Sequence, residues 1–217
     1  MGWGGKMGRE FLDIFEKWAN TYDTSLTNDT EYQEVFRHYD YILSEVAKRS
    51  FGHVVEFGTG TGNLTKKLID LGLKVTGIEP SLSMRKLAED KLGNLAIISD
   101  GDFLQFEIDV PPNTFTSTYA FHHLTDEEKE AAISCYSKLL STGGKIVFAD
   151  TMFESNESYL KAIQSALDNG YTNLAEDLQR EYYTTIPKLD KMLAAYKFVS
   201  SFNKVNDFVW IMEAVKQ

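Results

Sequence analysis

The chain has 217 residues, of which 43% are hydrophobic and 25% are charged, as in an ordinary globular protein. Its 32 acidic side chains outnumber 22 Lys and Arg, which gives a formal net charge of −10. This balance disfavours nucleic acids and anionic membrane surfaces as partners, because both attract basic proteins. The single cysteine, Cys135, excludes an intramolecular disulfide and is typical of the reducing cytosol, so we expect a cytoplasmic protein. We expect no insertion into a membrane, because no apolar run approaches the roughly 18 residues that a spanning helix needs.

Residues 1–50 are predicted to be helical. Aromatic and apolar side chains recur at helical spacing in two series, from Phe11 to Tyr22 and from Tyr32 to Val46.

Residues 53–150 alternate between predicted strands and helices. The predicted strands are 53–57, 74–79, 95–99, 115–121 and 145–149, and the predicted helices run from Thr61 to Leu71, from the N-cap Ser81 to Leu92 and from a capping box at Thr125 to Leu140. This β-α-β alternation predicts an α/β fold with a mostly parallel sheet that helices cover on both faces. Ligands of such sheets bind at the carboxyl ends of the strands.

The last third of the chain predicts two or three helices over residues 151–195, followed by strands at 198–205 and 208–215. Only Asn206 and Asp207 separate these two strands, so a hairpin joins them and one strand at that edge is antiparallel to the rest. We therefore expect a seven-stranded sheet in a single domain over residues 1–217. Its parts are a helical lid (1–50), a ligand-binding core (53–150), a helical segment (151–195) and the C-terminal strands (196–217).

The most informative segment is the loop between the first predicted strand and helix, Glu56-Phe57-Gly58-Thr59-Gly60-Thr61-Gly62. Glycines at such a turn let the backbone approach a ligand closely. The fingerprint of dinucleotide-binding loops is Gly-x-Gly-x-x-Gly. Counted from Gly58, its third glycine falls on Asn63, so the spacing argues against a nicotinamide-dependent oxidoreductase, which we keep as an alternative.

Acidic residues follow the next two predicted strands. Glu79 ends the second strand, where a carboxylate can accept hydrogen bonds from both hydroxyls of a ribose. Asp100 and Asp102 follow the third strand, where either carboxylate can accept from an adenine amino group and Phe103 can pack beside the ring.

These motifs resemble those of the class I S-adenosylmethionine (SAM)-dependent methyltransferases. The resemblance covers residues 53–150 and rests on four motifs, Glu56-x-Gly58-x-Gly60-x-Gly62, Glu79-Pro80-Ser81, Gly101-Asp102 and Gly143-Gly144. The stretch Trp18-Ala19-x-x-Tyr22-Asp23 is similar to the N-terminal lid of bacterial small-molecule members.

The resemblance implies a Rossmann-like, doubly wound fold that binds SAM as its cofactor. It favours Asp102 over Asp100, because the family places a glycine directly before the acid, and it places Tyr22 in a lid over the cofactor. Glu56 is a candidate partner for the cationic methionine end of SAM. The predicted cofactor-binding residues are Glu56, Gly58, Gly60, Gly62, Glu79, Pro80, Asp102, Phe103 and Tyr22.

His122 and His123 follow the fourth predicted strand and are candidates for a general base, because histidine titrates near neutral pH. His123 is our first choice, although His-His-Leu is common in the family without acid–base duty. We predict no metal site, because His38 and His53 lie far away in the sequence and no cysteine cluster exists.

The sequence thus predicts a methyltransferase that acts on a small-molecule acceptor. Tyr182 and Tyr183 are candidates to line the acceptor pocket. A non-catalytic SAM-binding scaffold protein stays open as an alternative, and a nucleic-acid or protein methyltransferase is disfavoured by the acidic charge. The acceptor, the attacking atom and the oligomeric state are not determined by the sequence.

Overall fold

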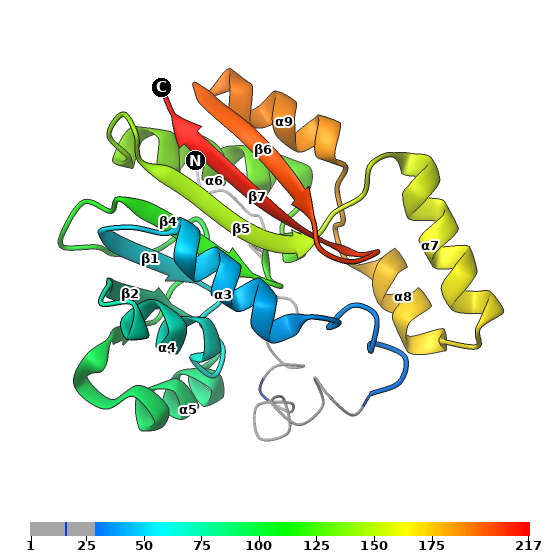
Figure 1. Cartoon of the computed structure of the whole chain (residues 1–217), viewed down its shortest axis with the longest axis horizontal. Coiled ribbons are helices and arrows are strands. Elements are labelled where there is room, and N and C mark those ends of the chain that lie inside the picture. The colour runs from blue at the N-terminus through cyan, green and yellow to red at the C-terminus, as the bar shows by residue number, and fades with distance from the viewer. Residues whose placement is uncertain (1–15, 17–28) are drawn as a thin grey trace.

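The computed structural model describes residue 16 and residues 29–217 (Figure 1). Most of the predicted lid, including Tyr22, lies outside the described residues. The helices of the described part are α3 (Tyr39–Arg49), α4 (Asn63–Asp70), α5 (Leu82–Leu92), α6 (Asp126–Leu139), α7 (Asn156–Asp168), α8 (Thr172–Arg180) and α9 (Ile186–Ala195), with short 3₁₀ turns η2 (Gly93–Leu95) and η3 (Phe121–His123). The strands are β1 (His53–Phe57), β2 (Lys74–Ile78), β3 (Ile97–Ser99), β4 (Thr114–Thr118), β5 (Lys145–Thr151), β6 (Phe198–Lys204) and β7 (Val209–Lys216).

The seven strands form one sheet in the order β3-β2-β1-β4-β5-β7-β6. Strands β1 to β5 are parallel, and β7 runs antiparallel to both β5 and β6. This confirms the predicted fold class and locates the antiparallel strand beside the edge strand β6. The order reverses at β1, between β2 and β4, where open α/β sheets bind their ligands.

Helices cover both faces of the sheet, and alternate strand residues face the two layers (Figure 1). Val54 of β1 and Val147 of β5 pack with the buried residues of α3 and α4. Their neighbours Val55 and Phe148 belong to the opposite cluster, which contains the buried residues of α6 and α9. Strands β1 and β5 are therefore buried on both faces, as the centre of such a sheet requires.

The hairpin between β6 and β7 is fixed by Asn206, which is 2% exposed. Its Oδ1 accepts from the backbone N–H groups of Phe208 at 2.9 Å and Val209 at 2.7 Å. Its Nδ2 donates to the carbonyl of Arg37 at 2.9 Å, which ties the hairpin to the chain before α3.

Helices α7 and α8 lie side by side beyond the carboxyl end of β5 and share a small apolar cluster with Val35 and Phe153 (Figure 1). This places the segment after β5 next to the edge of the sheet where ligands are expected. Among the described residues, none of the helices has the length and hydropathy to span a bilayer.

Three predicted boundaries were wrong. The helix predicted from Tyr32 begins only at Tyr39, because residues 30–38 form turns and His38 has a φ of 68°. The fourth strand ends at Thr118, where Tyr119 adopts a φ of 55°. The third strand begins at Ile97, after the turn η2.

Candidate functional site

The glycine loop after β1 has the left-handed conformations that its sequence predicts. Gly58, Gly60 and Gly62 have φ values of 64°, 56° and 85°, which disfavour other residues. A Cβ atom on Gly58 would lie 2.8 Å from the Cβ of Ala120, so the loop also lies too close to the chain after β4 for a side chain. The Gly58 N–H donates to the carbonyl of Ile78 at 2.9 Å, which ties the loop to the end of β2.

Glu79 connects this loop to the end of β2. Its side chain accepts from the N–H groups of Gly60 at 2.8 Å and Ser81 at 2.9 Å. Burial raises the pKa of Glu79, and these two hydrogen bonds offset part of that effect. The carbonyls of Glu79 and Pro80 accept from Arg85, which fixes the turn into α5. A carboxylate offers about four acceptor positions, so the Glu79 side chain retains capacity for a ligand.

Glu56 lies beneath the loop and is 1% exposed. Its carboxyl accepts from the hydroxyl of Thr65 at 2.6 Å. Burial raises the pKa of Glu56 to about 8, the Thr65 hydrogen bond opposes this, and the nearby charge of Glu79 raises it further. The side chain is therefore mostly protonated at neutral pH without a ligand, and its pairing with a cationic ligand stays a prediction.

The acids after β3 differ in their surroundings. Asp102 is 4% exposed, and its Oδ1 accepts from the N–H groups of Leu104 at 2.9 Å and Gln105 at 2.8 Å. Asp100 is largely exposed and forms an ion pair with Arg85 at 2.8 Å. A buried, oriented carboxylate is the better candidate for a specific contact, and the choice of Asp102 over Asp100 stays a prediction.

The contact of an adenine ring with Phe103 stays a prediction, and the Phe103 side chain is part of the protein core. It is buried in the core, where it stacks on Phe57 with ring centroids 5.1 Å apart, and its carbonyl accepts from the Tyr136 hydroxyl at 2.8 Å. Phe103 therefore supports the loop after β3 from the core.

A second group of polar side chains follows β4 and β5. His122 lies in η3. Its ring Nδ1 is 2.6 Å from Oδ1 of Asp150, and its backbone N–H donates to Oδ2 of Asp150 at 2.7 Å. The Thr151 N–H also donates to Asp150, at 2.8 Å. Burial lowers the pKa of His122, but the Asp150 charge and hydrogen bond, with Glu181, outweigh it and leave the pKa raised.

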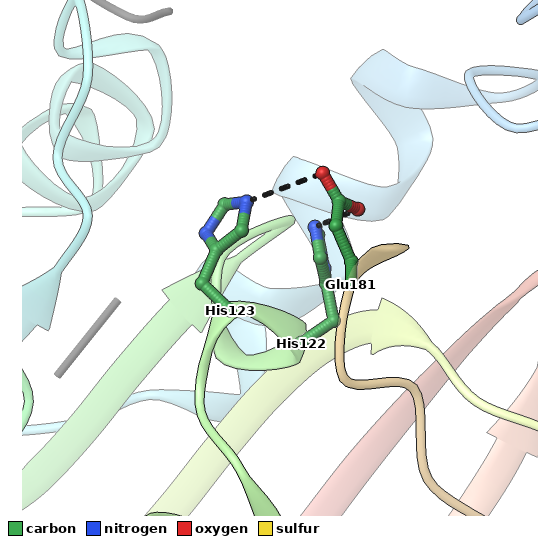
Figure 2. A group of neighbouring side chains, drawn as sticks. All are labelled: His122, His123 and Glu181. Atoms are coloured by element: carbon green, nitrogen blue, oxygen red, sulfur yellow. Dashed lines mark ion pairs between the residues drawn. The ribbon is translucent and has the colours of Figure 1, made fainter. Parts of the chain in front are cut away.

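Glu181 reaches the two histidines from the end of α8 (Figure 2). Its carboxylate oxygens lie 3.4 Å from Nε2 of His122 and 4.0 Å from Nε2 of His123. The Tyr183 hydroxyl donates to Glu181 at 2.6 Å, and the Tyr183 ring stacks on His122 with centroids 5.0 Å apart. Of the predicted acceptor-side tyrosines, Tyr183 thus lies in the cluster, whereas Tyr182 is partly exposed beside it.

The pKa of His123 is held well below its usual value by burial first, and then by the charges of His122 and Lys129. A lowered pKa keeps the ring neutral and makes it a weaker base, and the role of His123 as the general base stays a prediction.

Lys129 holds the chain after α8 beside the histidines through hydrogen bonds. It is 1% exposed, and its ammonium group donates to the carbonyls of Leu124 and, at 2.6 Å, Tyr182. Burial lowers the pKa of Lys129 to about 8, against the opposing charges of Asp126 and Asp150. The Tyr182 N–H donates to the His122 carbonyl at 3.0 Å, which completes the connection.

Sequence reasoning missed Asp150, Glu181 and Lys129. The position of Asp150 in the last strand of the β-α-β region was an available signal, because ligands bind at such strand ends. Glu181 offered none, since only the tertiary fold brings it to η3, and Lys129 stands in a run of charged residues that is typical of an exposed helix start.

The sheet order and the polar loops after β1, β2 and β3 define the Rossmann-like fold of the class I SAM-dependent methyltransferases. Residues 54–144 match a family described as a methyltransferase domain. An "uncharacterized methyltransferase" of Anoxybacillus flavithermus is 58% identical over 97% of this chain and 100% of its own length. A protein of the same description from Geobacillus kaustophilus is 55% identical over 97% of this chain and 99% of its own. The chain belongs to this family of SAM-dependent methyltransferases.

Solved structures of low sequence identity share the fold. Magnesium protoporphyrin IX methyltransferase from Synechocystis PCC 6803, crystallised with SAM, has a TM-score of 0.69 at 17% identity, with full coverage of both chains. DhpI, in a complex described as DhpI-SAM-HEP, has a TM-score of 0.72 at 17% identity over 98% of this chain and 99% of its own.

Proposed function

We propose that this protein transfers the methyl group of SAM to a small-molecule acceptor. The observation that carries the proposal is the convergence of the glycine loop, Glu79 and Asp102 at the carboxyl ends of the adjacent strands β1, β2 and β3. Bound there, SAM supplies an electrophilic methyl group on a sulfonium centre.

The residues of this edge suit the parts of SAM. Glu79 offers a buried carboxylate to the ribose hydroxyls, and Asp102 offers one to the adenine amino group. The absence of a side chain at Gly58 and Gly60 admits the ligand close to the backbone. Four further residues complete the described part of this proposed site, Glu56, Gly62, Pro80 and Phe103, and Tyr22 would approach it from the lid.

The acceptor is proposed to lie beside η3, at the ends of β4 and β5. The segment after α8 runs over His122, where it excludes water from a reaction that depends mainly on alignment of the reactants. Thr184 in this segment has a buried hydroxyl with no hydrogen-bond partner in the described part of the chain. The solved neighbour that acts on magnesium protoporphyrin IX supports a small-molecule acceptor for this fold.

Calorimetric titration with SAM, S-adenosylhomocysteine and NAD tests the cofactor assignment. We expect both adenosyl ligands to bind and NAD not to bind. Glu79→Ala and Asp102→Ala each remove buried hydrogen bonds to the ligand and should weaken SAM binding by about 1–3 kcal/mol.

Asp100→Ala is the matched control, because it removes an exposed carboxylate from the same strand end. It should change SAM affinity by less than about twofold. Binding of NAD alone, or unchanged affinity for SAM in both Glu79→Ala and Asp102→Ala, would refute the assignment.

A further inference from the structure

We propose that His122, His123 and Glu181 form a binding site for a divalent cation of the zinc class. Each side chain offers one ligand atom, and the three atoms lie within 4.8 Å of one another. Figure 2 shows both imidazole rings and the carboxylate directed toward one another from η3 and from the end of α8. The sequence predicted no metal site, because only histidines and cysteines were considered as further ligands and Glu181 was not included.

The distances fit a small ion. Ligands bound to zinc at about 2.0–2.1 Å in a tetrahedral site lie roughly 3.3 Å from each other. The Glu181 carboxylate is 3.4 Å from Nε2 of His122 and 4.0 Å from Nε2 of His123. The three ligand atoms lie within 4.8 Å of one another, so they would have to approach by at most about 1.5 Å to reach the separation of a tetrahedral site.

The surroundings of the cluster orient its ligand atoms. Asp150 binds Nδ1 of His122 at 2.6 Å and is itself held by two backbone N–H groups. This arrangement leaves Nε2 of His122 directed at Glu181, and a carboxylate behind a histidine is the usual outer partner in metal sites. Tyr183 fixes the Glu181 carboxylate in the same way, through a hydrogen bond of 2.6 Å.

Ligand chemistry decides the class of ion. Two imidazoles with one carboxylate favour zinc and other late divalent transition metals over calcium or magnesium, which prefer oxygen ligands. Three protein ligands also leave a position open, as in catalytic zinc sites. On the basis of the proposed function, this position would hold an anionic oxygen or sulfur atom of the methyl acceptor.

Cobalt(II) titration of tag-free protein tests the site without SAM or an acceptor. We expect one Co²⁺ per chain, with visible absorption bands that differ from those of the aqueous ion, and displacement by Zn²⁺. Glu181→Gln can keep the Tyr183 hydrogen bond but loses the carboxylate ligand, so it should abolish these bands. Asp150→Asn should weaken Co²⁺ binding by about 10–100-fold.

His38→Asn is the matched control, because it removes an exposed histidine outside the cluster and asparagine tolerates the left-handed backbone there. It should leave Co²⁺ binding unchanged. Absence of Co²⁺ binding, or equal binding by wild type and Glu181→Gln, would overturn the proposal. SAM titration of the same samples separates the two proposals, since SAM binding without metal binding refutes only the metal site.

Discussion

Substitution of Glu56 by glutamine should make stability at neutral pH higher and less dependent on pH. The pKa of Glu56 is about 8 in the folded protein, against an ordinary value of 4.5. As pH rises above 4.5, the unfolded chain loses this proton first, so folding becomes less favourable until pH reaches about 8. The resulting cost is about 1 kcal/mol at pH 5, about 3 kcal/mol at pH 7 and about 5 kcal/mol above pH 8.

Glutamine has nearly the same shape, can accept from Thr65 and carries no charge, so Glu56→Gln avoids this cost. Urea unfolding would be measured without ligand at several pH values between 5 and 8. The free energy of unfolding of the variant, relative to wild type, should increase as pH rises. Glu107→Gln, at an exposed position, is the control and should leave the pH profile unchanged. A stability difference between Glu56→Gln and wild type that stays constant over this range would refute a buried, protonated Glu56.

Backbone conformation gives three further predictions, each measured by urea unfolding. Gly58→Ala should lower the free energy of unfolding by about 2–4 kcal/mol, because strain at positive φ adds to the clash with Ala120. Gly72→Ala has open space around the new Cβ atom and should lower it by only about 1–2 kcal/mol. Equal losses in the two variants would contradict the clash. Lys197→Gly should stabilise by about 0.5–1 kcal/mol because Lys197 has a φ of 65°, and a loss of stability would contradict this. Asn206→Ala should cost about 1–3 kcal/mol because it leaves buried backbone groups unpaired, and a neutral effect would show that they find other partners.

The parts of the fold that sequence predicted well are those where local chemistry decides the conformation. Thr125 and Glu128 form the expected capping box, and Ser81 caps α5 through the Met84 N–H. The loop at Gly58–Gly62 follows from glycines that adopt positive φ between a strand and a helix. Such features depend on neighbours a few residues away, so the sequence pattern determines them.

The predictions from sequence were wrong or missing where tertiary contacts override the local pattern. The aromatic residues from Tyr32 to Tyr39 have helical spacing, yet the segment forms turns and packs against other parts of the fold. Phe36 lies 5.2 Å from Tyr119, measured between ring centroids, and the Arg37 carbonyl accepts from Asn206. The cluster around Glu181 was not predicted for the same reason, because contacts between β4, β5 and the chain after α8 assemble it.

Transfer of a labelled methyl group from SAM is the most direct test of the central claim. The purified protein would be incubated with methyl-labelled SAM, at a concentration below saturation, and either a low-molecular-mass metabolite fraction, bulk RNA or bulk protein, with Glu79→Ala as the variant of weakened SAM binding. We predict enzyme-dependent label in the small-molecule fraction alone, and less of it with Glu79→Ala. Label in RNA or protein alone would contradict a small-molecule acceptor, and SAM binding without transfer to any fraction would favour a scaffold protein.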